Sequence, residues 1–333
     1  MINGHGDDAY RYTAIRANFS SNVYHRVNHD GLNRYLSGCL SCIRSYPEPE
    51  PYALAAELAQ LHGVSPEEVC VTNGATEAIY LIAQAFRGSH SAVWIPTFSE
   101  YADACRLHGH RVEGISSLEK LTGNEGIFWL CNPNNPTGQT WDAATLRRLI
   151  AAYPRKLFVI DQSYALFTEK EVLSVAETVK LPNVLLLHSM TKCYAVPGLR
   201  LGAVTGSREL RACRMPWSVN ALAVEAGHYL LQHPEEYRMD IQALLAERKR
   251  VTDALEALGG VEVLPTDTHY FLARLQQGTA AQLKEFLATW HGLLIRDASN
   301  FEGLDARYFR IAIQTEEKNN LLIEGIHEWI QNS

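Results

Sequence analysis

Short apolar segments alternate with amphipathic helical patterns between residues 68 and 189, and this alternation constrains the fold more than any other feature. Five strands are predicted, with the sequences EVCVTNG, SAVWIP, GIFWLCNP, KLFVIDQS and NVLLLHS. Helices are predicted between them over 75–88, 98–109 and 142–153. Apolar strands separated by helices are typical of a mostly parallel sheet with helices on both faces. The sequence therefore predicts an α/β fold.

The residues that can carry chemistry gather where these strands end. The strands lead into residues 73–74, 96–98, 132–138, 161–164 and 189–192, which are rich in Asn, Gly, Pro, Ser, Thr and Asp. Sheets of this kind bind ligands beyond the carboxyl ends of their strands. A lone lysine in such a turn is most often a solvated charge. Because it lies beside these other segments, however, Lys192 in the last segment is a candidate Schiff-base lysine, whose amine condenses with a carbonyl group.

After about Met215 the pattern changes to long helical segments, followed by short strands such as VEVLP, HYFLARL and YFRIAI. The segments 218–232 and 234–260 both read as helices. This pattern predicts a smaller α+β domain packed on the first. We expect an N-terminal arm over 1–40, a large domain over 41–230, and a small domain over 231–333 that includes part of the arm.

Composition excludes several classes of protein. The chain has 333 residues and a net charge of −7, which disfavours a nucleic-acid or anionic-membrane surface as the main partner. No apolar run is long enough for a membrane span, and the start has no signal-peptide pattern. Cys39 and Cys42 form a CxxC pair without a second pair, so no metal site is expected. Seven scattered cysteines favour reduced thiols and a cytoplasmic location.

A lysine that forms an imine with an aromatic aldehyde cofactor needs defined neighbours. The ring nitrogen needs a buried carboxylate, for which Asp161 is the candidate at the end of its strand. Tyr164 and Asn135 are candidates for contacts with the ring hydroxyl, and Phe98 for the ring face. Each of these residues has an ordinary structural interpretation, but the set at strand ends favours a cofactor site around Lys192.

The cofactor phosphate needs backbone N–H groups at the start of a helix. The sequence NGATE provides them: Gly74 allows the turn, and Ala75 and Thr76 open the helix. Ser189 and Arg200 are candidates to add a hydroxyl and a guanidinium to the same phosphate.

The order NPNNPTG, DQSY, SMTKCYAVPGLRLG, YFRIAI resembles the fold-type-I aminotransferase superfamily, which uses pyridoxal 5′-phosphate. The resemblance covers nearly the whole chain and implies a large domain with a mostly parallel sheet and a smaller α+β C-terminal domain. By this resemblance Lys192 is the lysine that binds the cofactor, and Asp161 pairs with its pyridinium nitrogen. Tyr164 and Asn135 contact the ring oxygen O3′, and Arg310 binds the substrate carboxylate.

Members of the superfamily are usually homodimers with shared active sites. The segment RSYPEPEP resembles the one whose tyrosine, here Tyr46, reaches the cofactor phosphate of the neighbouring subunit.

Within the superfamily the chain is similar to two groups, histidinol-phosphate aminotransferases and L-threonine-O-3-phosphate decarboxylases of cobalamin synthesis. The decarboxylases, which give (R)-1-amino-2-propanol O-2-phosphate, are favoured by four segments: HG at 5–6, NFSSNVY with Asn22, MPWSVNALA and IRDASNFEGLDARYFRIAI. In that group residues equivalent to His5, Gly6, Asn22 and Arg296 gather around the substrate phosphate. The N-terminal signature commonly runs His-Gly-Gly, whereas Asp7 follows Gly6 here. An aspartate pointing inward would repel a phosphate.

We therefore expect a decarboxylase acting on a small phosphorylated amino acid, with a transaminase that uses 2-oxoglutarate and glutamate as the alternative. A non-catalytic cofactor-binding sensor domain is a further alternative, although known regulators of this kind fuse it to a DNA-binding module. A nicotinamide-dependent enzyme is disfavoured because NGATEA is not a GxGxxG sequence.

Overall fold

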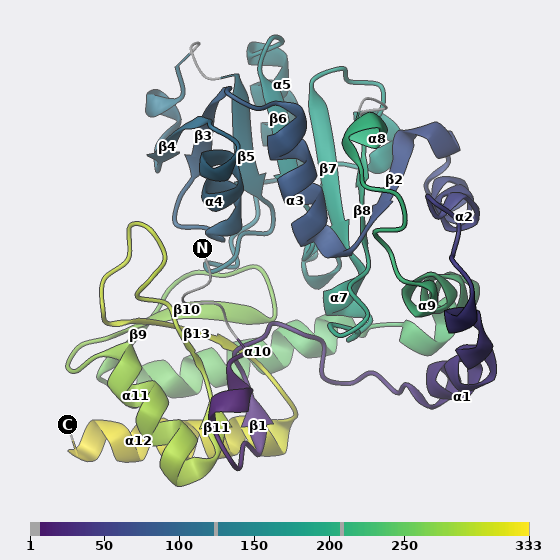
Figure 1. The fold of residues 1–333 in the computed structure, drawn as a ribbon. Coiled ribbons are helices and arrows are strands. Elements are labelled where there is room, and N and C mark those ends of the chain that lie inside the picture. Colours follow the sequence, from purple (N-terminus) through teal and green to yellow (C-terminus); the bar gives the residue numbers. More distant parts are fainter. Residues whose placement is uncertain (1–6, 123–125, 207–209, 333) are drawn as a thin grey trace.

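A computed structural model describes residues 7–122, 126–206 and 210–332 of the chain. Its largest feature is a seven-stranded sheet with the strand order β2-β8-β7-β6-β5-β3-β4 (Figure 1). The strands are β2 (Val69–Thr72), β3 (His90–Trp94), β4 (Arg111–Ile115), β5 (Ile127–Cys131), β6 (Leu157–Asp161), β7 (Val184–Ser189) and β8 (Gly202–Thr205). The central strands pair in parallel, and only β8 runs antiparallel to its neighbours β2 and β7. The predicted α/β fold with a mostly parallel sheet is confirmed.

Helices cover both faces of this sheet because each central strand is apolar on both sides. In β5, Ile127 and Trp129 pack in one buried cluster with α3 (Gly74–Ala85) and α4 (Glu100–Leu107). Phe128 and Leu130 point to the opposite face and pack with α5 (Ala143–Ala152). This alternation follows from the two-residue period of a strand. The Asp142 side chain accepts a hydrogen bond from Thr145 N–H and caps α5.

The remaining helices of this part of the chain complete the layers. They are α1 (Asp30–Cys39), α2 (Tyr52–His62), α6 (Val175–Thr178), α7 (Met190–Cys193), α8 (Leu210–Cys213) and α9 (Ala221–Gln232). Helices α2 and α9 share a buried cluster with strands β2 and β8 at one edge of the sheet.

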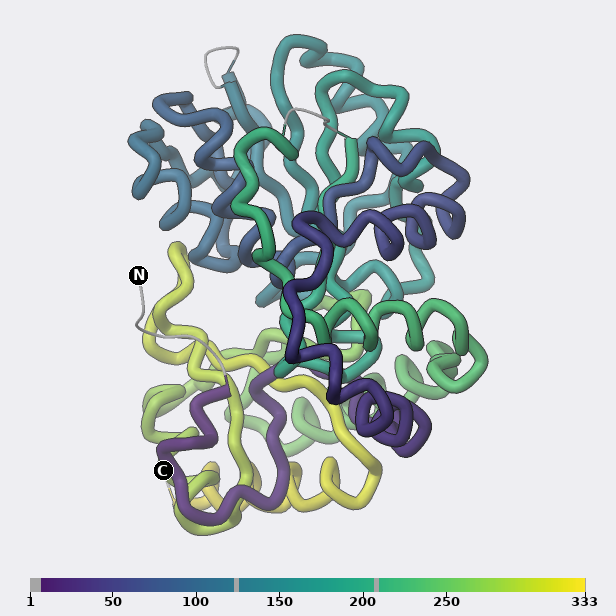
Figure 2. Tube along the Cα trace, turned by 45° about the vertical axis from the view of Figure 1, so that its right-hand side comes forward, coloured from purple at the N-terminus to yellow at the C-terminus, as the bar shows by residue number. Residues whose placement is uncertain are grey.

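The C-terminal third forms a second, antiparallel sheet with the order β12-β13-β10-β9. Its strands are β9 (Val261–Val263), β10 (Tyr270–Leu275), β12 (Arg296–Asp297) and β13 (Tyr308–Ala312). Helices α10 (Ile241–Ala257), α11 (Ala280–Phe286) and α12 (Glu316–Asn332) accompany it. The N-terminal arm contributes β1 (Ala17–Asn18), which pairs in parallel with β11 (Leu293–Leu294). Figure 2 shows the arm running beside the C-terminal third before it crosses to the large sheet.

Three details differ from the predicted elements. The segment 234–260 is interrupted before α10, because a short 3-10 turn over Pro234–Tyr237 precedes it. The arm contains a helix, α1, which the sequence pattern did not indicate because Gly31 and Gly38 lower its helix propensity. Strands β4 and β8 were not predicted either. None of the described helices is long and apolar enough to cross a membrane.

Candidate active site

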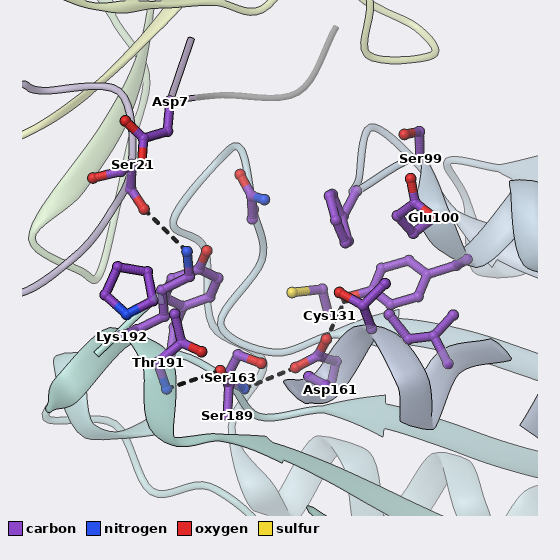
Figure 3. Close-up of a pocket in the computed structure, with 18 of the residues that line it drawn as sticks. Asp7, Ser21, Ser99, Glu100, Cys131, Asp161, Ser163, Ser189, Thr191 and Lys192 are labelled. Atoms are coloured by element: carbon purple, nitrogen blue, oxygen red, sulfur yellow. Dashed lines mark hydrogen bonds between the residues drawn. The ribbon is translucent and has the colours of Figure 1, made fainter. Parts of the chain in front are cut away.

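A cavity of about 720 Å³ lies at the carboxyl ends of the central strands, where the two sheets and the N-terminal arm meet. Most of the side chains that the sequence predicts for the site line it. These are Ala75, Thr76, Phe98, Asn135, Asp161, Tyr164, Ser189, Lys192, Arg200, Arg296 and Arg310. Residues from distant parts of the chain therefore converge at one place (Figure 3).

Lys192 belongs to α7, the short helix that begins directly after β7. Ser189 caps this helix, because its Oγ accepts a hydrogen bond from Thr191 N–H at 3.2 Å. The Lys192 amine enters the cavity and donates to the backbone carbonyl of Ser21 at 3.1 Å. Burial, together with the nearby Arg310 and Arg200 guanidinium groups, lowers the pKa of this amine to about 8. A lysine with such a pKa is readily deprotonated and can act as a nucleophile near neutral pH.

Asp161 ends β6 at the floor of the cavity and is buried. Its Oδ2 accepts a hydrogen bond from the Tyr101 phenol at 2.7 Å, and its Oδ1 accepts one from Ser163 N–H at 2.8 Å. Burial raises the pKa of the Asp161 carboxyl, and the hydrogen bonds from Ser163 and Tyr101 oppose this effect. A buried carboxylate that faces a cavity favours a cationic partner there.

The start of α3 provides a cradle for an anion. Gly74 has a φ of +74°, and a Cβ atom on it would lie 2.6 Å from Nη2 of Arg200. A Cβ atom on Gly202 of β8 would lie 2.7 Å from Ala75 N. Glycine at these two positions therefore leaves the first N–H groups of α3 and the Arg200 guanidinium accessible together, an arrangement that suits a phosphate. Ser189 lines the same cavity.

Aromatic and amide groups form the walls. Tyr164 is buried, which raises the pKa of its phenol, and its ring packs against that of Tyr270 at a centroid distance of 4.9 Å. Phe98 lines the cavity and packs edge to face against the Tyr101 ring at 5.9 Å. Asn135 accepts a hydrogen bond from Arg310 through its side-chain oxygen. The cavity thus brings aromatic side chains and polar groups together with Asp161, a lining that suits a planar ring with polar substituents.

Two arginines from the C-terminal sheet enter the cavity side by side. Arg296 of β12 and Arg310 of β13 are direct partners in the antiparallel register, and both are buried. The Arg296 guanidinium donates to Asn300 Oδ1 at 2.7 Å and lies over the Phe301 ring at 5.1 Å. The Arg310 guanidinium donates to Asn135 and to the backbone carbonyl of Ser20. Burial, together with the charge of Arg310, lowers the pKa of Arg296 to about 10.

Two predicted residues do not line the cavity, and two others fall outside the described part of the chain. Asn22 is buried at 1% exposure but does not line the cavity. Tyr46 lies on the surface with 84% of its side chain exposed, away from the cavity of its own chain. His5 and Gly6 lie outside the described residues.

Sequence reasoning missed several lining residues. Tyr101 supports Asp161, and the backbone of Ser20 and Ser21 accepts from the two cationic side chains Arg310 and Lys192. A backbone contact leaves no signal in a sequence. Two further carboxylates, Asp7 and Glu100, line the cavity. Asp7, in the arm, stood out in the sequence only because it departs from the His-Gly-Gly signature of the family.

The residues present fit pyridoxal 5′-phosphate. A carboxylate on the floor matches the pyridinium nitrogen, a lysine of lowered pKa matches the aldehyde, and the glycine-lined helix start beside Arg200 matches the phosphate. Fold and site together define a pyridoxal-phosphate-dependent enzyme of fold type I.

Comparison with known proteins gives the family. The pattern of the family described as aminotransferase class I and II matches residues 41–326, and the chain belongs to this family. The chain is 31% identical to threonine-phosphate decarboxylase of Salmonella typhimurium, over 92% of this chain and 89% of that protein. It is 30% identical to a histidinol-phosphate aminotransferase of Desulfitobacterium hafniense, over 90% and 87% of the two chains. The crystal structure of L-threonine-O-3-phosphate decarboxylase from Porphyromonas gingivalis is similar with a TM-score of 0.92 and 40% identity, covering 95% of this chain and 99% of that one.

Proposed function

We propose that this protein decarboxylates L-threonine-O-3-phosphate to (R)-1-amino-2-propanol O-2-phosphate, a step of cobalamin synthesis. The observation that carries the proposal is the pairing of Arg296 and Arg310 across β12 and β13. Like charges directly opposite each other in an antiparallel pair are destabilising, so a ligand with two anionic groups stabilises this arrangement. A phosphorylated amino acid has two such groups, a carboxylate and a phosphate. The similarity to two threonine-phosphate decarboxylases supports the same substrate.

When bound, pyridoxal 5′-phosphate accepts electrons from a bond at Cα of the substrate. In the proposed reaction Lys192 would hold the cofactor, and its amine would exchange a proton at Cα of the substrate. Asp161 keeps the ring nitrogen protonated, with Tyr101 and Ser163 orienting its two oxygens. Arg310 binds the carboxylate and Arg296 the phosphate. Because the two arginines come from neighbouring strands, they set the rotation of the substrate about Cα and so the bond that is broken.

Histidinol-phosphate transamination is the second candidate, and Glu100 is the observation that favours it. This carboxylate is buried, lines the cavity, and accepts a hydrogen bond from the Tyr80 phenol at 2.6 Å. The imidazole of histidinol phosphate carries an N–H donor that a carboxylate in the cavity can accept. Threonine phosphate has no such group on its side chain.

A single-turnover experiment with the cofactor-loaded protein separates the candidates. With L-threonine-O-3-phosphate we expect release of CO2 and of the aminopropanol phosphate, with the cofactor absorbance returning to its starting form. Conversion of the cofactor to its amine form without CO2, reversed by 2-oxoglutarate, would contradict decarboxylation and support transamination. Histidinol phosphate would then be the next substrate to test.

The protein is proposed to act as a homodimer. The contact of Tyr46 with Trp217 and further exposed apolar side chains close to these two in the sequence support this, because exposed apolar surface marks sites of interaction. The Tyr46 ring packs against Trp217 at 5.2 Å, and the apolar residues are exposed to 53% (Leu40), 67% (Ile43), 72% (Met215) and 48% (Trp217). In the proposed dimer Tyr46 reaches the cofactor phosphate of the partner.

Sedimentation of the protein and of Ile43→Glu tests the dimer. We expect a dimer for the parent and for Trp290→Glu, a control whose side chain is 76% exposed on the C-terminal third. Ile43→Glu should sediment as a monomer. A parent that sediments as a monomer would overturn the proposal.

Two further predictions remain proposals. The division into an arm (1–40), a large domain (41–230) and a small domain (231–333) is supported by the separate sheets of the two parts. A cytoplasmic location is supported by the seven cysteines, all of which are free.

A further inference from the structure

Asp7 lines the cavity, and the proposed reaction leaves it without a role. Its carboxylate is held in place, because Asn18 Nδ2 donates to Asp7 Oδ1 at 2.5 Å. Its backbone N–H donates to Ser20 Oγ at 3.1 Å. The φ of Asp7 is 65°, a left-handed conformation that glycine favours and aspartate tolerates. An anionic side chain therefore occupies a position suited to glycine, and two hydrogen bonds fix it there.

The segment that fixes Asp7 also contacts two cations of the site. The carbonyl of Ser20 accepts from Arg310, and the carbonyl of Ser21 accepts from the Lys192 amine at 3.1 Å. Figure 3 shows Asp7 next to Ser21, on the side of the cavity where the Lys192 amine lies. The position of the carboxylate is thus coupled to that of the lysine through a short stretch of the arm.

Charged groups of several elements act on the Lys192 amine. Burial, Arg310 of β13 and Arg200 lower its pKa, whereas Asp7 of the arm and Asp161 of β6 raise it. Both carboxylates line the same cavity as the lysine. Two uncharged titratable groups are also near. His269 stays neutral because burial lowers its pKa to about 3, and Tyr164 stays neutral because burial raises its pKa.

We propose that Asp7 is a positioning residue that keeps a proton on the Lys192 amine, so that Cα of the substrate is protonated and decarboxylation prevails over transamination. This inference rests on the proposed function. The bond between Cα and the carboxyl carbon breaks, CO2 leaves, and the electron pair stays with the substrate. A C–H bond then forms at Cα with the proton from Nζ. One proton is consumed, and nothing is oxidised or reduced. A neutral amine would instead remove the Cα proton, which begins transamination.

The first test measures the lysine in the full chain without cofactor. Competitive acylation of lysines across a pH series, followed by mass spectrometry, gives the pKa of Lys192, with the exposed Lys249 as an internal reference. Asp7→Asn and Asp7→Gly should each lower the pKa of Lys192 by about half a unit or more. Glycine suits the backbone at this position, so the second variant should fold. The control Asp30→Asn removes an exposed carboxylate outside the cavity and should change nothing. An unchanged lysine pKa in both Asp7 variants would overturn the inference.

The second test uses the cofactor-loaded protein and L-threonine-O-3-phosphate. In Asp7→Asn the ratio of CO2 release to conversion of the cofactor into its amine form should fall about tenfold, and the alkaline limb of the pH profile should move to lower pH. A lowered lysine pKa with an unchanged ratio and profile would overturn the role in the reaction. A parent protein that releases no CO2 would overturn the proposed function, while the lysine measurement would still show whether Asp7 acts on Lys192.

Discussion

The phenol of Tyr101 lies 2.7 Å from Oδ2 of Asp161, and both groups are buried at the floor of the cavity. Burial raises the pKa of Tyr101 well above its usual value, so the phenol remains a donor at all ordinary pH values. Ser163 N–H holds the other oxygen. The aspartate is thus fixed from both sides, and the hydrogen bonds favour its charged form, which a cationic ring nitrogen requires.

Tyr101→Phe should lower kcat without unfolding the protein. The phenylalanine ring keeps the stacking on Trp129, whose centroid lies 5.9 Å away, but Asp161 loses a hydrogen bond that favours its ionised form. Loss of a hydrogen bond to a charged group costs about 1.5–3 kcal/mol, which corresponds to a decrease of about tenfold to a hundredfold. Steady-state kinetics with saturating cofactor measures it. Tyr12→Phe is the matched control, because Tyr12 also donates to a carboxylate, that of Glu285, on the surface. Equal kcat values for parent and Tyr101→Phe would contradict this role.

The sequence predicted the sheet and most of the cavity because the relevant signals are local. Apolar strands followed by Asn, Gly, Ser or Asp place side chains at one edge of a parallel sheet, so Lys192 and Asp161 could be assigned to the same place. Tyr101 was missed because its contact with Asp161 depends on how α4 packs against β5 and β6. Nothing in the residues next to Tyr101 distinguishes it from an ordinary core residue of an amphipathic helix.

The structure of the N-terminal arm and its backbone contacts were also not predicted from the sequence. The arm has no clear strand or helix pattern in its sequence, because β1 has only two residues and Gly31 and Gly38 weaken the helical signal of α1. Its tertiary contacts are nevertheless specific, since the carbonyl of Ser21 meets Lys192 across 171 positions of the sequence. Such contacts follow from packing of the complete chain and cannot be inferred from residue type. The position of Asn22 outside the cavity lining belongs to the same category.

The roles of Arg296 and Arg310 should be distinguishable by comparing the binding of two ligands, with and without a phosphate. Arg296→Gln should weaken binding of L-threonine-O-3-phosphate about a hundredfold and leave binding of L-threonine nearly unchanged. Arg310→Gln should weaken both, because a carboxylate is common to the two ligands. Truncating one partner of a buried charged pair typically costs about 2–5 kcal/mol, which sets this magnitude. Dissociation constants from titration of the cofactor absorbance measure it.

A control arginine from the same sheet accompanies these two variants. Arg274→Gln on β10 removes a guanidinium that contacts Asp305 and Glu262 outside the cavity, and it should leave both affinities unchanged. If Arg296→Gln weakened L-threonine as strongly as its phosphorylated form, Arg296 would not be the phosphate ligand.

Lys192→Met should abolish the absorbance band of lysine-bound cofactor and yet leave the cofactor-free chain equally or more stable. A buried amine whose pKa has fallen from 10.5 to about 8 is less stable in its charged form than in water, so its burial costs free energy below about pH 10.5, and the full cost applies below pH 8. Methionine has a similar length and no charge. Chemical denaturation of the cofactor-free proteins at pH 7 measures the stability, with the exposed Lys249→Met as control. A large loss of stability in Lys192→Met, or a band that persists, would contradict the assignment.

Stability should fall as the pH drops from 6.5 towards 4. Burial lowers the pKa of His25 and His188 to about 4 and that of His269 to about 3, whereas the unfolded chain protonates histidine near 6.5. Below 6.5 the unfolded state binds more protons than the folded state, so each histidine lowers the free energy of unfolding by up to about 1.4 kcal/mol per pH unit. Above pH 6.5 this contribution is constant.

His269→Leu removes one such group from a fully buried position against Phe167 and should make the dependence of stability on pH shallower. Urea unfolding of the cofactor-free chain at pH 5 and 7 gives the slope, with exposed His327→Gln as the control. An identical slope in parent and His269→Leu would show that His269 does not stay neutral in the folded protein.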